Sequence, residues 1–405
     1  MNPVVQPPAS TTLRLRGGGW LDTATGTTER RDLLVHAGRI AVDDGRPALD
    51  HDVTGCTLMF GLWDCHVHPG ENLYGPDGGE FLETVPARTI RAGENLRSAM
   101  AAGITGVRCL DEADDIDLDY ARAVEAGRFA GPRIHGAGRA LRSTGGHGTF
   151  YPRVHAYATA MHVIDGPVAA MRAVREQVER GARWIKVMLT GGLASRYEEV
   201  DQPQLSDEEL TAVVRTATQR GIPVAAHCGG ATPAIRFATL GGRSIEHGYA
   251  LSEEAVAAMA TNGTWLVPTI GVTHDPSFLA EGDNWPEFSL ARAKATRARH
   301  AESLAMARAA GVRIAVGADL NPVAARYHAE LSLLEQAGMP RLEVLHAATV
   351  GGRHLNDLGD ASLPVPGAAA DLIVVEGDPL ADPQVLAAPV LVVVDGAIRV
   401  SRLAT

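Results

Sequence analysis

The chain contains the stretch Gly61-Leu62-Trp63-Asp64-Cys65-His66-Val67-His68-Pro69, which follows the apolar residues 57–60 and predicts a short buried strand. Side chains alternate along a strand, so His66 and His68 point the same way. At the carboxyl end of the strand they could present two imidazoles to one metal ion. A lone His-x-His pair is weak support for a metal site, so its meaning depends on the rest of the chain.

Short apolar strands alternate with amphipathic helices from residue 61 to residue 359. The pattern predicts helices at 90–102, 120–126, 166–179 and 289–310, and strands at 106–110, 184–189, 222–226 and 312–316. About eight such units without an internal repeat predict an α/β protein of the (β/α)8 TIM barrel type. A doubly wound open sheet is the alternative, but no glycine fingerprint for a dinucleotide follows a first strand.

Both ends of the chain are rich in short strands. Residues 1–60 contain strand-like runs joined by turns, and residues 360–405 contain apolar β-branched runs with a hairpin turn signal at Asp395-Gly396. These two segments predict one small β-sandwich domain built from both chain termini, beside a barrel domain at 61–359.

Composition restricts the function classes. The chain has 405 residues, with 37 basic against 48 acidic side chains and a net charge of −11, which argues against a nucleic-acid partner. Four cysteines without a CxxC pattern predict no disulfide framework. Residues 1–12 lack the pattern of a signal peptide, and no apolar run is long enough for a membrane span. We therefore expect a cytoplasmic protein that acts on a small molecule.

Polar side chains stand at or near the carboxyl ends of the predicted strands, where barrels place their catalytic groups. They are His66, His68, Lys186, His227, His247 and Asp319. Imidazole and carboxylate groups are ligands for Zn²⁺ and related ions, and four histidines with one carboxylate exceed the needs of one tetrahedral site. Singly, each could be a core or capping residue; together they favour a site for two metal ions.

Lys186 is one of only two lysines in the chain, with Lys294, and it lies inside the apolar strand 184–189. It could simply extend its amine from a strand end or neutralise buried carboxylates. Alternatively, desolvation lowers the pKa of a buried lysine, and the neutral amine can react with CO₂. The resulting carbamate has two oxygens that could bridge two metal ions.

The order His-x-His, Lys, His, His, Asp on successive strands resembles the amidohydrolase superfamily of metal-dependent hydrolases, as do the motifs at 61–68, 245–248 and 317–319. The chain looks most like imidazolonepropionase-related and Xaa-Pro dipeptidase-like members. The resemblance implies that His66, His68 and Asp319 hold one divalent metal ion, with zinc favoured over Mn²⁺, Co²⁺ and Fe²⁺. It implies that His227 and His247 hold a second, with carboxylated Lys186 as the bridge.

The same resemblance implies the chemistry. A hydroxide between the two metal ions would attack an amide carbon, and Asp319 would pass its proton to the leaving amine. Homo-oligomers are frequent among similar proteins. Asp319 is followed here by Leu320-Asn321-Pro322 where a small residue is expected, so the pocket mouth differs from the family pattern.

Four further residues are candidates for substrate contact. His147 lies in the glycine-rich loop 143–148, and Tyr249 follows the His247 strand, where its hydroxyl could donate to the scissile carbonyl. Arg196 could pair with a substrate carboxylate, although a solvated loop arginine is the simpler interpretation. His328 opens a helix and is the weakest candidate. The acidic run 111–119 is interpreted as a solvated loop.

The sequence leaves several substrates open. The leading hypothesis is hydrolysis of a linear amide, either a dipeptide or an N-acyl amino acid. A cyclic amide such as an imidazolone or hydantoin is the second, and a carboxylate-binding arginine near the site would favour the first. A third is a mononuclear deaminase, but a single metal ion needs no carbamate bridge, so Lys186 argues against it. An esterase or phosphotriesterase is also possible, because the same metal-bound hydroxide can attack those substrates. A barrel that had lost its activity is disfavoured, because every metal-binding residue that the resemblance implies is present in the sequence.

Overall fold

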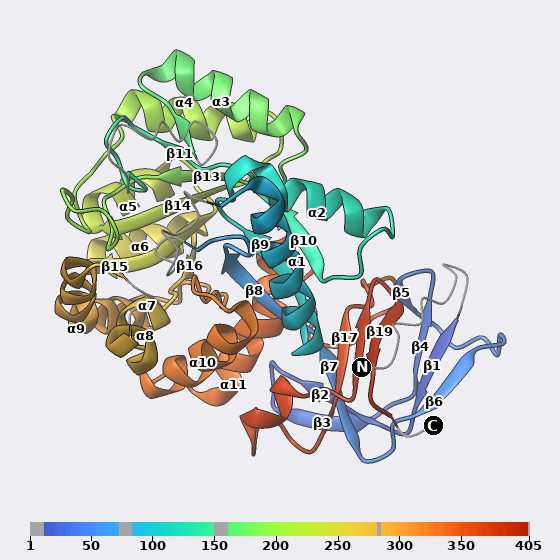
Figure 1. Ribbon diagram of the computed structural model, residues 1–405. Coiled ribbons are helices and arrows are strands. Elements are labelled where there is room, and N and C mark those ends of the chain that lie inside the picture. Colours follow the sequence, from blue (N-terminus) through green and yellow to red (C-terminus); the bar gives the residue numbers. More distant parts are fainter. Residues whose placement is uncertain (1–11, 73–82, 150–160, 282–284, 404–405) are drawn as a thin grey trace.

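The computed structural model describes residues 12–72, 83–149, 161–281 and 285–403. Strands from the two ends of the chain share one six-stranded sheet, which Figure 1 shows as blue strands beside red strands. In spatial order this sheet contains β19 (Ala397–Ser401), β18 (Leu391–Val394), β17 (Leu372–Glu376), β7 (Cys56–Phe60), β2 (Gly19–Asp22) and β3 (Thr27–Arg30). The amino- and carboxyl-terminal regions therefore fold together.

A second sheet accompanies the first. It has four strands in the order β5 (Arg39–Ala41), β4 (Leu33–His36), β1 (Leu13–Arg16) and β6 (Leu49–Asp52). Leu15, Val35, Leu58 and Val393, from both sheets, belong to one buried apolar cluster. Burial of that cluster holds the two sheets together. The domain boundaries at residues 60 and 360 and the sandwich arrangement stay predictions.

The middle of the chain contains parallel strands separated by helices. One sheet has the order β10 (Arg133–Gly136), β9 (Ile104–Cys109), β8 (Leu62–Val67). The other has the order β12 (His162–Val163), β11 (Leu141–Arg142), β13 (Ile185–Met188), β14 (Val224–Gly230), β15 (Ser244–Ala250), β16 (Trp265–Val267). Parallel strands that alternate with helices are the arrangement expected of a (β/α)8 protein.

Backbone hydrogen bonds join these two sheets on both sides. The Arg183 N–H donates to the Gly136 carbonyl over 2.9 Å, next to β10 and β13. On the other side, residues 312–316 do not form the predicted continuous strand and have one isolated bridge, between Ile314 and Leu266. The backbone of this segment still bonds to both neighbours: Ala315 N–H donates to the Leu266 carbonyl (3.1 Å), and Cys65 N–H donates to the Val316 carbonyl (2.8 Å). The carboxyl ends of β8, β13, β14 and β15 are thereby brought to one side of the molecule.

Helices follow most of these strands. They are α1 (Val85–Ala101), α2 (Ile116–Glu125), α3 (Pro167–Glu179), α4 (Asp207–Thr218), α5 (Ala231–Thr239), α6 (Glu253–Asn262), α7 (Gly271–His274), α8 (Pro276–Glu281), α9 (Glu287–Ala309), α10 (Val323–Gln336), α11 (Arg341–His346) and α12 (Gly352–Leu355). Three short helices are η2 (Ala113–Asp115), η4 (Ala347–Gly351) and η5 (Pro383–Ala387). The long helix predicted at 289–310 is α9, two residues longer at its start. Among the described residues, no helix has both the length and the apolar character needed to cross a membrane.

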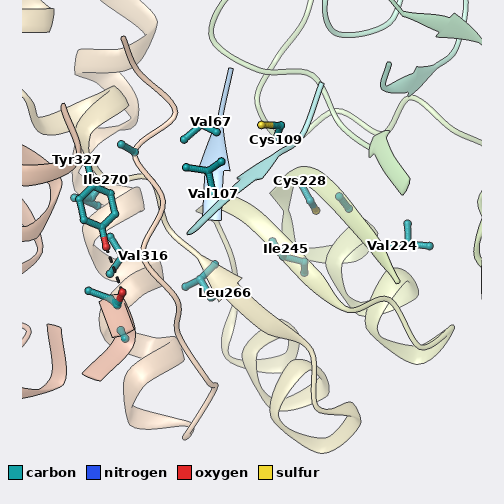
Figure 2. Packing of buried hydrophobic residues seen from close by; sticks show 14 of the residues in the cluster. Val67, Val107, Cys109, Val224, Cys228, Ile245, Leu266, Ile270, Val316 and Tyr327 are labelled. Carbon is teal, nitrogen blue, oxygen red and sulfur yellow. Dashed lines mark hydrogen bonds between the residues drawn. The ribbon is translucent and has the colours of Figure 1, made fainter. Parts of the chain in front are cut away.

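Apolar side chains fill the space between the strands and the surrounding helices. Figure 2 shows Val107, Ile245, Leu266 and Val316 in this cluster, and all four side chains are buried. On β8, Val67 belongs to the same cluster, whereas its two neighbours His66 and His68 line a pocket. The strand period of two thus separates a packing residue from candidate ligands on this strand.

The interpretation of the acidic run 111–119 as a solvated loop was wrong. The structure places Asp115 and Asp117 in buried positions, and helix α2 begins at Ile116. The Gly138 N–H donates to Asp117 over 3.0 Å, and the Arg139 N–H donates to Asp115 over 3.2 Å. These carboxylates satisfy backbone N–H groups of the segment that follows β10, which explains why they are buried.

Asp117 makes the stability of the protein depend on pH. Burial raises the pKa of Asp117 to about 7, against the opposing hydrogen bonds from backbone N–H groups. The folded state therefore keeps a proton that the unfolded chain loses near pH 4, and stability falls as pH rises toward 7. An Asp117→Asn variant cannot ionise and keeps a carbonyl oxygen for Gly138. We expect the free energy of unfolding of the variant, measured relative to that of the parent, to rise by about 1–3 kcal/mol when the pH is raised from 4 to 8.

Urea unfolding at pH 5 and pH 8 measures this difference. The matched control is Asp119→Asn, whose side chain is 72% exposed, and which should show the parent's pH dependence. An equal effect of Asp117→Asn at both pH values would contradict the expectation.

Candidate active site

Three of the predicted ligands converge at the end of β8. His68 Nε2 lies 2.9 Å and His66 Nε2 lies 3.3 Å from the same oxygen, Asp319 Oδ1. One ligand atom from each residue lies within 4.8 Å of the others, which is close enough for a shared metal ion. The burial of His66 and the partial burial of the other two limit competition from water.

The remaining nitrogens of these two imidazoles are fixed by the protein. His66 Nδ1 donates to the Glu246 carboxylate over 2.9 Å, and His68 Nδ1 donates to the Asp111 carbonyl over 2.7 Å. Such bonds select the tautomer whose Nε2 lone pair points the other way, toward Asp319. The two imidazoles are therefore oriented so that both Nε2 atoms could bind one metal ion.

Two further imidazoles stand beside this group, on β14 and β15. The ring centroids of His227 and His247 are 4.4 Å apart, and that of His247 is 5.0 Å from that of His66. His227 Nε2 donates to the Gly191 carbonyl over 3.0 Å, and His247 Nδ1 is hydrogen-bonded to the Thr269 hydroxyl at 2.7 Å. His227 Nδ1 and His247 Nε2 take no part in these two hydrogen bonds and could each bind a metal ion.

Lys186 lies on β13, with an exposed fraction of 1%, and lines the same pocket. Burial lowers its pKa to about 8, although the charges of Glu246 and Asp319 oppose the shift. About a tenth of the amine is therefore neutral at pH 7, far more than for a lysine in water, and the neutral amine is the form that reacts with CO₂. Burial alone would raise the pKa of Asp319, but His66, His68 and Lys186 outweigh it and hold the carboxyl below its usual range.

Four non-glycine residues at this site have positive φ angles. The φ angles of Asp111, His247, Thr269 and Asp319 are 133°, 69°, 45° and 58°, all in the region that favours glycine. Two of these residues are candidate ligands, and the other two hold candidate ligands by hydrogen bonds. Residues kept in such conformations are concentrated at functional sites, where the surrounding fold compensates for the strain.

A pocket of about 1040 Å³, part of it open to solvent, surrounds all six candidate ligands. His147 and Tyr249, two of the predicted substrate contacts, also line it, together with Arg142. Its apolar wall consists of Met161, Met188, Leu193, Val272, Phe278, Trp285 and Leu320. The pocket therefore combines a polar floor, a guanidinium group and an extended apolar wall.

His147 and Tyr249 both pack on candidate ligands. The His147 ring stacks on His227 with centroids 4.0 Å apart, and its Nδ1 lies 2.6 Å from the Glu198 carboxylate. Burial would raise the pKa of Glu198, but His147 and Gln204 outweigh it and hold the pKa at about 2. Tyr249 stacks on His247 at 5.0 Å. Burial raises its pKa well above the ordinary value, so its hydroxyl keeps the proton and can donate.

Two predicted substrate contacts lie elsewhere. The Arg196 guanidinium covers the Phe288 ring at 4.9 Å and is absent from the described lining of the pocket. His328 Nε2 donates to the Ala102 carbonyl over 2.9 Å, between α10 and the end of α1, and is also absent from that lining. Leu320 does line the pocket, so the unusual segment after Asp319 shapes its wall.

Sequence reasoning missed Arg108, Glu246, Glu198 and Arg142. Arg108 and Glu246 interrupt buried strands, and the reasoning applied to Lys186, that a charge inside an apolar strand needs an explanation, would have identified them. Glu198 and Arg142 lie in segments for which the sequence does not show which other parts of the chain pack beside them. Their roles could only be recognised once the pocket was assembled.

Comparisons with known proteins agree with this geometry. The family model described as the amidohydrolase family matches residues 57–399. An ochratoxinase from Aspergillus niger is 32% identical over 354 residues, which cover 82% of this chain and 72% of that protein. The structure of a prolidase complexed with N-methylphosphonate-L-proline has a TM-score of 0.87 at 32% identity, covering 97% of this chain and 100% of that one.

A Xaa-Pro dipeptidase with bound methionine has a TM-score of 0.86 at 27% identity, covering 96% of this chain and 99% of that one. An imidazolonepropionase from Acidiphilium cryptum is 28% identical, covering 71% of this chain and 73% of that protein. The predicted resemblance is thus confirmed. The chain belongs to the amidohydrolase family and is a hydrolase of carbon–nitrogen bonds.

Proposed function

We propose that the protein is a binuclear metal-dependent amidohydrolase that cleaves the amide bond of a dipeptide or an N-acyl amino acid. The observation that carries the proposal is that the six candidate ligands all line a single pocket: His66, His68, Lys186, His227, His247 and Asp319. The proposal includes a closed (β/α)8 barrel at 61–359 and a β-sandwich at 1–60 and 360–405. The net charge of −11 supports a small-molecule substrate without a nucleic-acid partner.

The donor set fits two divalent ions, with zinc favoured by its preference for imidazole and carboxylate ligands. His66, His68 and Asp319 would hold one ion, and His227 and His247 the other. When bound, the ions would lower the pKa of water and polarise the substrate carbonyl.

Lys186 would bridge the ions as a carbamate. Its neutral nitrogen attacks the carbon of CO₂, an N–C bond forms, and one N–H proton leaves to solvent. The product is an anion with two oxygens. Burial of Lys186 among His66, His227 and His247 supports this role.

Asp319 and Tyr249 have distinct roles in hydrolysis. Asp319, held below its usual pKa range, accepts a proton from the attacking water and then donates it to the leaving amine. Tyr249, which keeps its proton, donates a hydrogen bond to the carbonyl oxygen as negative charge develops there. His147, fixed by Glu198 at Nδ1, presents the opposite edge of its ring to the substrate.

Arg142 supports a substrate with a free carboxylate. It is the arginine of the described pocket lining, and guanidinium groups bind carboxylates in two-point fashion. The apolar wall around Phe278 and Trp285 suits an apolar side chain or acyl group, and these two rings pack edge to face at 5.3 Å. The similarity to a prolidase and to an ochratoxinase is consistent with a linear amide.

An activity panel tests the proposal directly. Metal-loaded protein is assayed with dipeptides, N-acyl amino acids, a hydantoin and an imidazolone. We expect turnover of the linear amides. Turnover of the cyclic amides alone would contradict the proposed substrate class and favour the relationship to imidazolonepropionase.

Arg142→Met tests the carboxylate contact. We expect KM for an N-acyl amino acid to rise by about tenfold or more, and KM for the same compound as its C-terminal amide to stay within about twofold. Because Arg142 also donates to the Gly146 carbonyl at 3.4 Å, disturbance of the His147 loop would affect both compounds equally, so the ratio of the two KM values is decisive. Arg196→Met is the matched control, with no expected change. An unchanged ratio of the two KM values would contradict a contact between Arg142 and the substrate carboxylate.

A further inference from the structure

A buried ion pair lies directly behind the candidate ligand His66. Arg108 on β9 and Glu246 on β15 both have exposed fractions of 0%. One Arg108 amino group donates to both oxygens of the Glu246 carboxylate, over 2.9 and 2.8 Å. The second of these oxygens also accepts the bond from His66 Nδ1.

The other donors of Arg108 fix its position. Its Nε donates to the Cys65 carbonyl over 2.6 Å, next to His66 on β8, and its second amino group donates to the Ser244 hydroxyl over 2.8 Å. The Ser244 hydroxyl donates in turn to Glu246 Oε1 over 2.5 Å. The guanidinium also lies 4.5 Å from the centre of the Trp184 ring, on the segment leading to Lys186.

From β9, Arg108 thus contacts β8, which carries His66, β15, which carries His247, and the residue before β13, which carries Lys186. Paired charges of this kind are costly to bury, and a well-packed apolar pair often stabilises a fold equally well. The ion pair therefore calls for a reason other than stability. A bond from a carboxylate to the far nitrogen of an imidazole fixes its tautomer and strengthens it as a metal donor.

We propose that Arg108 and Glu246 are positioning residues that hold His66 in its metal-binding orientation, with Ser244 as their support. Glu246 sets the orientation and the electron density of the imidazole, and Arg108 fixes Glu246 between β8 and β15. The inference rests on the proposed function only in that His66 is taken as a metal ligand.

The test measures Co²⁺ binding without substrate, by titration of metal-free protein and by the visible absorption of bound Co²⁺. Arg108→Met/Glu246→Leu removes both charges together, so that neither is left buried and unpaired. We expect its Co²⁺ affinity to fall by about 10- to 100-fold, with an altered spectrum. Arg108→Met/Glu246→Gln keeps an acceptor for His66 Nδ1 and should recover part of the loss.

The matched control is another ion pair with a buried carboxylate. Arg133 donates to Asp371 over 2.8 and 3.2 Å, outside the described lining of the candidate active site. Arg133→Met/Asp371→Asn should lower thermal stability without a change in Co²⁺ affinity or spectrum. Ser244→Ala leaves both charges paired and should weaken Co²⁺ binding less, which keeps the test decisive if the double variant does not fold.

Parent affinity and spectrum in a folded Arg108→Met/Glu246→Leu protein, or in Ser244→Ala when the double variant does not fold, would overturn the inference while leaving the proposed function intact. Failure of the parent protein to bind Co²⁺ would overturn both, so the two failures are distinguishable.

Discussion

Asp319→Asn lowers kcat for amide hydrolysis by about 10²- to 10⁴-fold, because an amide cannot take a proton from water and return it to an amine. Asp319 is suited to this transfer by its position: Oδ1 lies within hydrogen-bond reach of His68 Nε2, and Oδ2 lies 3.7 Å from His247 Nδ1. The side-chain oxygen of the introduced asparagine can still contact a metal ion, so the loss should fall mainly on kcat and less on metal content.

Steady-state kinetics and metal analysis on the same preparations separate these two effects. Asp201→Asn changes a half-exposed carboxylate that pairs with Arg299, and it should leave kcat unchanged. An Asp319→Asn enzyme that keeps kcat within about tenfold of the parent would assign the proton transfer to another residue.

Lys186→Met should lower activity at least about 100-fold, because it removes the amine on which the bridging carbamate would form. Methionine keeps most of the buried volume, so the change tests the nitrogen rather than the packing around it. Activity of the parent should rise with added bicarbonate after the protein has been depleted of metal and CO₂, whereas the variant should not respond.

The composition of the chain gives this prediction an unusually clean control. Lys294 is the other lysine of the whole chain, and it is exposed on α9. Protein loaded with ¹³C-bicarbonate should show a carbamate resonance that Lys294→Ala retains and Lys186→Met loses. Retention of the resonance in Lys186→Met would contradict a carbamate at this position.

The candidate ligands could be predicted from sequence because each stands at the end of its own strand. His66 and His68 follow from the period of two within one strand, and His227 and His247 from the rule that barrel sites form where strands end. That these residues meet in one pocket could be predicted without knowing the shapes of the loops. The family resemblance then ordered them into two groups, which the close approach of His66, His68 and Asp319 matches for the first group.

The supporting residues could not be predicted in this way, because their partners are distant in the sequence. Glu198 meets His147 across 51 positions, and Arg108 meets Glu246 across 138. Asp117 was misread for the same reason: its acceptor is used by a backbone N–H group 21 positions away. From their charge and low hydropathy, such residues are expected to face solvent. Their binding partners become visible only when it is known which strands lie next to one another.

Arg142 illustrates a further difficulty, which concerns loops. Arg196 and Arg142 cannot be ranked as carboxylate ligands from a linear sequence, since both flank glycine-rich segments. The structure separates them, because Arg142 belongs to β11 inside the pocket and Arg196 packs over Phe288. Substrate contacts depend on such placements, whereas metal ligands depend mainly on strand ends.

Metal content per chain is the measurement that tests the binuclear site most directly. The parent protein and Lys186→Met are prepared with zinc and bicarbonate, freed of unbound metal, and analysed for zinc and protein together. We expect about two ions per chain in the parent and fewer in the variant, with activity lost in parallel. About one ion per chain in both proteins would contradict the bridged binuclear site and favour a mononuclear deaminase.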